Sequence, residues 1–260
     1  MRLLTILLSV VLLIACSTVP DSGRSQLLLI GSDQEMQLGL TAFEEIKETT
    51  PILTDAQQNA LLQRVGKRIA AVAPLPGAQW EFVLFDQPKM ANAFCLPGGK
   101  VGIYTGILPI TRDEEGLATV IGHEVAHAVA RHGAERMSHG LLVELGGMAL
   151  DQAMQNQAET TRALSHQAYG LTATLGVMLP YSRSHELEAD HLGLLYMARA
   201  GYDPNAAVGF WQRFSAYARE QGGQAPPEFL STHPVDERRI AQIRSLLPMA
   251  EAEYRQAIER

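Results

Sequence analysis

The stretch His123-Glu124-Val125-Ala126-His127 organises the rest of this sequence. On a helix, positions four apart share one face, so His123 and His127 can direct two imidazole rings at one metal ion. A surface helix that carries these residues by chance is the alternative, but His and Glu rarely lie unpaired in a core. The flanking residues favour a buried helix, because they are apolar at helical spacing: Leu117, Val120, Ile121, Val125, Ala128 and Val129.

Glu124 stands next to the first histidine, where it can reach a water molecule bound to the metal. Two histidines and an adjacent Glu on one helical turn are typical of zinc-dependent peptide hydrolysis. In that chemistry zinc makes the water acidic near neutral pH, and the Glu takes the proton and passes it to the leaving amine. We expect one zinc ion per chain and Glu124 as the general base.

A catalytic zinc site needs a third protein ligand. The sequence His-Glu-Leu-Glu-Ala-Asp at 185–190 offers Glu186 and Asp190, which share one helical face from which Glu188 points away. We expect Glu186 to bind the metal and Asp190 to accept a hydrogen bond from a ligating His. A solvated acidic helix face is the alternative. His185 is expected to be exposed.

Length and composition indicate a globular protein. The 260 residues are 47% hydrophobic and 19% charged, which suits one domain with a sizeable core. The net charge of -7 disfavours nucleic acid as a partner. Only two cysteines occur, so no disulfide framework is expected, and we expect Cys95 to be a small buried hydrophobe.

The N-terminus has the pattern of an export signal. An apolar run at 3–14 follows a basic residue and ends in Leu-Ile-Ala-Cys, which resembles the bacterial lipobox. We expect residues 1–15 to be a lipoprotein signal peptide, Cys16 to be lipidated and residues 16–31 to form a tether. An ordinary signal peptide or an anchor helix is the alternative. Ser17 resembles an outer-membrane address, which predicts a bacterial envelope protein anchored by lipid to the outer membrane and facing the periplasm.

Periodicity predicts an α+β fold that is mostly helical, with a small sheet beside the motif helix. A capping box of Thr111 and Glu114 is expected to open that helix, and Gly133 to close it. Small residues in the mostly helical stretch 141–181 suit close helix packing. A mobile lid over the site is the alternative. Other helices are expected at 32–47, 54–73, 184–200, 206–220, 236–247 and 250–259, and a strand at 80–85. The helix at 206–220 offers Phe210, Trp211 and Phe214 as core residues.

Residues 92–105 are expected to form a hairpin around a Pro-Gly-Gly turn. Its second strand could bind an extended substrate by backbone hydrogen bonds, or it could be a plain core hairpin. The predicted substrate edge consists of Lys100, Val101, Gly102, Ile103 and Tyr104.

Several motifs together resemble one family. H-E-x-x-H is followed by E-x-E-A-D, and Asn-Ala-Phe-Cys-Leu-Pro-Gly-Gly, Tyr-Ser-Arg and Ser-Thr-His-Pro occur in order around them. This set resembles the gluzincin family of membrane-linked metalloendopeptidases, which includes HtpX, the CAAX prenyl protease, BepA and LoiP. The resemblance covers 32–260 and implies a single zincin-type domain with Glu186 as third ligand. Without the membrane helices of HtpX or the helical repeats of BepA, the chain is most similar to the small LoiP-like lipoprotein branch.

The resemblance also implies roles near the C-terminus. It places His233 close to the metal, as a fourth ligand, as a catalytic group that stabilises the oxyanion, or as a switch that holds the enzyme off. It gives Arg239 an anchoring role in the same region.

These residues predict a zinc metalloendopeptidase that cleaves misfolded or misassembled cell-envelope proteins. Its partners would be polypeptide substrates, the membrane through the lipid on Cys16, and outer-membrane assembly machinery. The alternative is a chaperone-like outer-membrane assembly factor with little proteolytic activity. The intact Glu124 disfavours that alternative, because a scaffold has no need of a base beside the metal.

Overall fold

The computed structural model describes residues 16–220, 229, 233–234 and 237–259 of the chain. The predicted signal peptide at 1–15 and the side chain of Cys16 lie outside the described residues, so lipidation stays a prediction. The chain forms two compact units. We name them the sheet unit, residues 33–130 and 186–260, and the hairpin unit, which comprises 131–185 and the residues up to Ser32.

The sheet unit contains a three-stranded sheet of β3 (Glu81–Phe85), β4 (Ala93–Leu96) and β5 (Lys100–Tyr104). Strand β3 runs parallel to β5, and β4 runs antiparallel to it. Gly98 and Gly99 turn the chain between β4 and β5 at φ angles of 84° and 82°, which residues other than glycine rarely adopt. The expected strand and hairpin are therefore both present.

Strand β5 is the central strand of this sheet, since the order is β3-β5-β4. Both sides of its backbone are paired, so it has no free edge for a substrate. The expected substrate edge, Lys100 to Tyr104, is therefore wrong. The outer side of β3 is bonded to a loop, where Leu53 N–H donates to Leu84 O at 2.8 Å. Among the described residues, no strand pairs with the outer side of β4.

Helices pack around the sheet within this unit. Their apolar faces form the core: in α3 (Ala56–Ala70), buried Leu62, Val65 and Ile69 recur at helical spacing. Burial of each such side chain stabilises the fold by about 1.5–3 kcal/mol. The other helices of the unit are α2 (Ser32–Thr49), α4 (Leu108–Thr111) after the short η1 (Thr105–Ile107), α5 (Glu114–Val129), α8 (Leu179–Arg199) from residue 186 onward, α9 (Ala206–Glu220) and α11 (Glu237–Ile258).

Helix α5 carries the metal motif and lies beside β4, so the predicted mostly helical α+β fold with a small sheet at the motif helix is confirmed. Its start differs from the predicted capping box. The Asp113 carboxylate accepts from Gly116 N–H at 2.8 Å, while the Thr111 hydroxyl donates to Leu108 O inside α4. Asp113 is the better cap because its backbone is extended, at φ -138°, just before the first helical residue, as an N-cap residue requires.

Helix α5 also ends earlier than expected, at Val129. Arg131 adopts a left-handed conformation at φ 54°, which breaks the helical hydrogen-bond ladder. A new helix starts directly afterwards, and Gly133 lies inside it. The expectation that Gly133 closes the motif helix is therefore wrong.

The two helices expected at 236–247 and 250–259 form one helix, α11, with Pro248 inside it. Proline lacks a backbone N–H and so removes one hydrogen bond from a helix. Buried Ile243 and Ala250 lie on either side of Pro248, so packing holds the helix together across the missing bond.

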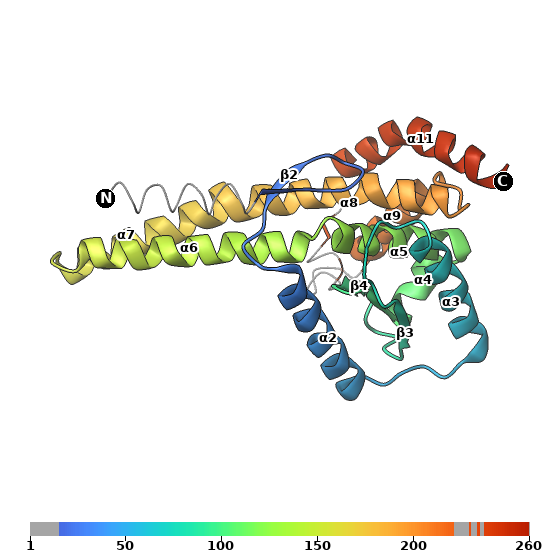
Figure 1. Cartoon of the computed structure of the whole chain (residues 1–260), viewed down its shortest axis with the longest axis horizontal. Helices are drawn as coiled ribbons and strands as arrows, with labels where there is room; N and C mark the ends of the chain where they lie inside the picture. Colours follow the sequence, from blue (N-terminus) through green and yellow to red (C-terminus); the bar gives the residue numbers. More distant parts are fainter. Residues whose placement is uncertain (1–15, 221–228, 230–232, 235–236, 260) are drawn as a thin grey trace. The chain divides into compact units, whose positions relative to one another are not determined.

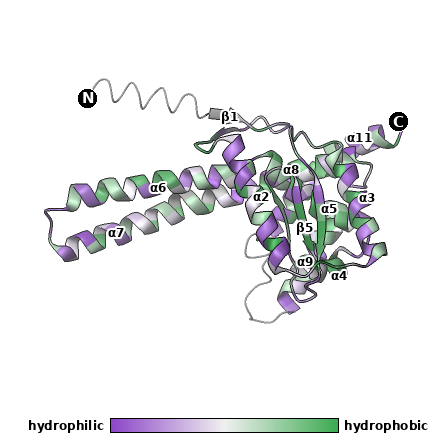
Figure 2. Ribbon diagram, turned by 60° about the horizontal axis from the view of Figure 1, so that its bottom comes forward, coloured by the Kyte–Doolittle hydropathy of each residue, from purple (hydrophilic) through white to green (hydrophobic). Residues whose placement is uncertain are grey.

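The hairpin unit contains two long helices, α6 (His132–Met154) and α7 (Glu159–Ala173), which lie side by side in Figure 1. Tyr169 OH donates to Val143 O at 2.7 Å, and a Cβ on Gly146 would collide with the Tyr169 hydroxyl. The small residues of this stretch therefore allow close packing. Figure 2 shows hydrophobic and hydrophilic residues mixed along both helices. Among the described helices, none combines the length and the apolar character needed to cross a membrane.

The rest of the hairpin unit consists of the π-helical turn η2 (Thr174–Met178), the first residues of α8, and strands β1 (Cys16–Thr18) and β2 (Ser25–Leu27). The two strands pair antiparallel. The segment expected to be a tether, residues 16–31, thus contains a small hairpin of its own.

His185, at the end of this unit, is only 2% exposed, so the expectation that it lies on the surface is wrong. Its Nε2 lies 2.8 Å from Glu135 Oε2, and the same carboxylate accepts two hydrogen bonds from Arg24 at 2.7 and 2.8 Å. A buried polar side chain needs such partners, and these come from distant parts of the sequence.

Candidate metal centre

Helices α5 and α8 approach closely in the sheet unit where Gly122 faces Gly193. A Cβ on Gly122 would lie 2.8 Å from Gly193 O, closer than side-chain atoms normally come. Gly193 stands about two helical turns after Glu186, on the same face of α8. The glycine contact therefore brings Glu186 beside the two histidines of α5.

Four potential ligand groups meet at this point: His123, His127, Glu186 and His233, whose donor atoms all lie within 4.8 Å of one another. His123 Nε2 lies 3.2 Å from both His127 Nε2 and His233 Nδ1. The Glu186 carboxylate lies 3.4 Å from His123 Nε2, 3.3 Å from His127 Nε2 and 2.9 Å from His233 Nδ1. The structure thus brings the predicted ligands and His233 together.

These separations fit a tetrahedral zinc site. Zinc–nitrogen and zinc–oxygen bonds of about 2.0–2.1 Å place tetrahedral ligands about 3.3 Å from one another. Five of the six donor pairs, each measured to the nearer Glu186 oxygen where Glu186 takes part, are 2.9 to 3.4 Å apart, and all six lie within 4.8 Å. Two imidazoles and a carboxylate are also the ligand types of one known class of catalytic zinc site, so the donor set fits the ion in chemistry as well.

Asp190 and Arg239 lie behind the donors. His123 Nδ1 is 3.1 Å from Asp190 Oδ1, so an N–H at Nδ1 leaves the Nε2 lone pair directed at the site. Arg239 donates to both oxygens of Asp190, from Nε at 2.6 Å and from Nη2 at 2.8 Å. Arg239 Nη1 also lies 3.2 Å from Glu186. The predicted second carboxylate and the predicted anchor therefore both lie against the donor group.

The electrostatics favour charged groups despite the burial. Burial lowers the pKa of His123, but hydrogen bonds to Asp190 and Glu186 outweigh it and raise that pKa to about 9. Burial raises the pKa of Glu186, but the nearby His127 and His123 hold it far below its usual range. The carboxylate is thus ionised, as a metal ligand must be, while a proton competes with the metal for His123.

Glu124 stands apart from the four donors. It is 4% exposed, and burial raises its pKa above the usual value. Its Oε1 has no hydrogen-bond partner among the described residues and lies 3.5 Å from His233 Nε2. A buried carboxylate with an unused oxygen and a raised pKa suits the transfer of a proton better than metal binding.

Other acidic and histidine residues lie elsewhere. Glu188 is buried, at 8% exposure, but is not among the donor group. His139 and His166 belong to the hairpin unit. His139 Nε2 lies 3.8 Å from Glu135, and His166 Nε2 lies 3.3 Å from Asp151.

Sequence patterns predicted the hairpin but not which of its two strands borders the site with an open side. Strand β4 lies beside α5, and its Cys95 thiol has a pKa raised by burial and by the charge of nearby Glu124. The order of the strands decides that β4, and not β5, has the open side. The Asn-Ala-Phe-Cys-Leu motif was the available signal, since it contains β4.

Comparison with known proteins gives a match over most of the chain: residues 56–247 match Peptidase family M48. The chain is 38% identical to the mitochondrial metalloendopeptidase OMA1 of Schizosaccharomyces pombe, over 90% of this chain and 67% of that relative. It is 35% identical to the human mitochondrial metalloendopeptidase OMA1, over 89% of this chain and 46% of that relative. The beta-barrel assembly-enhancing protease of Escherichia coli K12 is 28% identical, over 89% of this chain and 47% of its own length.

These relatives overturn the predicted location. We predicted a lipid-anchored bacterial outer-membrane protein that faces the periplasm, whereas the OMA1 relatives, at 31% to 38% identity, are mitochondrial. The LoiP-like branch is not supported either, because OMA1 proteins match at higher identity than the bacterial protease does. A short apolar run with one cysteine was too small a pattern to decide location.

The site and the family match agree on the class of reaction. The matched residues include the motif helix, the acidic cluster of α8 and the start of α11 with Arg239. The buried His and Glu donors and the carboxylate of Glu124 provide what metal-dependent peptide hydrolysis requires. The chain therefore belongs to peptidase family M48 and is a metalloendopeptidase.

Proposed function

We propose that the metal is zinc, held by His123, His127 and Glu186, and that the substrates are misfolded or misassembled proteins. The observation that carries the metal assignment is that five of the six donor pairs are 2.9 to 3.4 Å apart, which suits tetrahedral zinc. Zinc in such a site supplies a Lewis acid that lowers the pKa of water toward neutrality.

Glu124 is the proposed general base. Its raised pKa allows it to hold a proton between the two steps of the reaction, first removed from water and then given to the leaving amine. Its free Oε1 needs no broken hydrogen bond before it accepts that proton. Asp190 fixes the tautomer and direction of His123 throughout, with Arg239 fixing Asp190.

His233 has the position of a fourth ligand in this proposal. Its Nδ1 lies 2.9 Å from Glu186 and 3.2 Å from His123 Nε2. A catalytic zinc site keeps one position for water, so a histidine at that position holds the enzyme in a resting state. Movement of His233 away from Glu186 would then open the site.

Strand β4 is the proposed substrate edge. Tyr104 N–H donates to Asn92 O at 3.1 Å, and backbone groups alternate in direction along an antiparallel strand. The backbones of Ala93 and Cys95 therefore point away from β5, toward the open side, where the Ala93 N–H donates to Asn92 Oδ1 at 2.9 Å and the Cys95 backbone remains for a substrate. An extended substrate can pair there, and pairing through the backbone tolerates many sequences, which suits the disposal of misfolded proteins.

A casein digestion tests the proposed function. The purified chain should degrade unfolded casein, lose the activity to a chelator and regain it with added zinc. Glu124→Gln, loaded with zinc, serves as the control for a contaminating protease. Binding of casein without cleavage by the zinc-loaded parent would instead favour the chaperone-like alternative.

A further inference from the structure

We infer that Trp211 is a positioning residue of the metal centre, which acts through Arg239 and Asp190 on the His123 ring. The inference rests on the proposed function, because it concerns the side chains that would hold zinc. By its sequence alone Trp211 is only a core residue of α9. In the structure it is 1% exposed and contacts the site directly.

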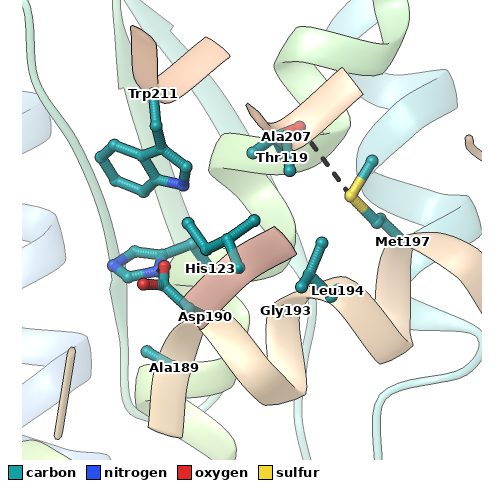
Figure 3. A pocket seen from close by; sticks show the side chains of 10 residues that line it. Thr119, His123, Ala189, Asp190, Gly193, Leu194, Met197, Ala207 and Trp211 are labelled. Carbon is teal, nitrogen blue, oxygen red and sulfur yellow. Dashed lines mark hydrogen bonds and ion pairs between the residues drawn. The ribbon is translucent and has the colours of Figure 1, made fainter. Parts of the chain in front are cut away.

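Trp211 contacts two side chains of the site. Its ring centroid lies 5.3 Å from that of His123, at an angle of 75°, which is an edge contact. The Arg239 guanidinium carbon lies 4.0 Å from the indole centroid. Figure 3 shows the Trp211 indole beside the His123 ring, with the Asp190 carboxylate against that ring. One aromatic side chain thus touches both the proposed ligand and the cation that holds the ligand's partner.

The Arg239 guanidinium needs the indole face of Trp211 because the guanidinium is buried away from water. Arg239 is 3% exposed, and its charge is balanced by Asp190 and Glu186. A flat aromatic surface under a guanidinium stabilises the charge and limits its tilt. The tilt matters, because two N–H groups must reach the two oxygens of Asp190 together. Asp190 in turn lies 3.1 Å from His123 Nδ1 and so fixes the orientation of that ring.

The side chains around the indole leave little empty space beside it. The cavity lined by Thr119, His123, Asp190 and Trp211 has a volume of about 10 Å³, close to the space of one water molecule. A smaller aliphatic side chain at 211 would leave a void, into which the guanidinium can tilt and water can enter.

Phe210 provides a matched control. It precedes Trp211 on α9, is 0% exposed and packs against Trp211 and Phe214 at centroid distances of 5.0 and 5.7 Å. Its ring pairs among the described residues do not include His123 or Arg239. Replacement of either aromatic by Leu removes a buried ring, but only one replacement removes a contact with the metal centre.

The experiment measures zinc affinity by competition with a chromophoric chelator for the parent, Trp211→Leu, Trp211→Phe and Phe210→Leu. Thermal unfolding in chelator reports the loss of core packing separately. Loss of a group that orients a ligand typically weakens metal binding about 10–100-fold, and we expect that loss for Trp211→Leu. Trp211→Phe keeps an aromatic face and should stay within about threefold of the parent. Phe210→Leu should lose stability but keep its zinc affinity.

Cobalt supplies a second readout that a purely structural role would not move. The visible spectrum of the cobalt-loaded protein reports the geometry of the ligands. It should change in Trp211→Leu and not in Phe210→Leu. If Trp211→Leu does not fold, Trp211→Met replaces it, because Met fills space without an aromatic face and should bind zinc more weakly than Trp211→Phe.

Two results would overturn the inference. The first is that Trp211→Leu, or Trp211→Met in its place, keeps the zinc affinity and the cobalt spectrum of the parent. The second is that Phe210→Leu loses as much zinc affinity as the Trp211 variant. A parent that binds no zinc would instead contradict the proposed function. The two failures are therefore distinguishable.

Discussion

His233 Nδ1 lies 2.9 Å from Glu186 Oε2, although 47 positions separate the two residues in the chain. This contact completes the group of four donors, because His233 Nδ1 also lies 3.2 Å from His123 Nε2 of α5. We expect His233→Ala to raise the turnover of a short peptide several-fold, because it frees the position at which water binds. His166→Ala, which removes an exposed histidine of α7, should leave turnover unchanged. A fall in turnover with zinc retained would instead assign His233 to oxyanion stabilisation.

Glu186→Gln should lose zinc and activity together. An amide keeps the shape of the side chain but lacks the negative charge that a metal site with two neutral imidazoles requires. Glu188→Gln is the matched control, since Glu188 lies on the same helix and is also buried, at 8% exposure. Zinc content by atomic absorption decides the point. Equal zinc in the Glu186 variant and the parent would remove Glu186 from the ligand set.

Glu124→Gln should retain zinc and lose turnover. Its carboxylate is not among the four donors, so the metal does not need it. General acid–base catalysis typically contributes about 10²–10⁴-fold, and we expect a loss at least that large. Zinc content and peptide turnover should be measured on one sample. If turnover survived, the proposed base would be wrong.

Cys95→Pro should weaken substrate binding while zinc content stays unchanged. Proline removes the N–H that points to the open side of β4 and leaves the bonds to β5 intact. One backbone hydrogen bond is worth about 0.5–1.5 kcal/mol, so KM should rise several-fold. Cys95→Ala removes only the thiol and should behave like the parent. The same KM in all three proteins would argue against pairing along β4.

Glu135 should make the fold sensitive to acid. Burial raises its pKa, but hydrogen bonds with His185 and Arg24 outweigh it and lower the pKa from 4.5 to about 2. A lowered pKa means that the ionised form stabilises the fold above pH 4.5, and that this stabilisation is lost as the pH falls toward 2. The shift corresponds to about 3 kcal/mol of unfolding free energy.

Urea unfolding in chelator at pH 7, 4.5 and 3 measures this contribution. Glu135→Gln should be less stable than the parent at neutral pH and should lose less of its remaining stability in acid. Parallel pH curves for the two proteins would contradict the assignment. The chelator matters because metal loss in acid would otherwise add its own pH dependence.

The parts of the site that the sequence determined by itself are local. His123 and His127 share a face because the helical period requires it, and Glu186 and Asp190 do so for the same reason. Apolar periodicity predicted α3, α5 and α9 close to their observed positions, since each helix buries one stripe of its own residues. The family resemblance rested on these short motifs.

Only the tertiary structure decided the rest, because it depends on contacts between distant residues. Strand order made β4 the open edge, and no pattern within β5 could reveal that a strand lies on each side of it. His185 can be buried because its Nε2 meets the Glu135 carboxylate, which in turn accepts from Arg24 of a remote segment. Trp211 contacts Arg239 because α9 and α11 pack together. Local periodicity specifies which side chains share a face, but the packing of elements specifies what that face meets.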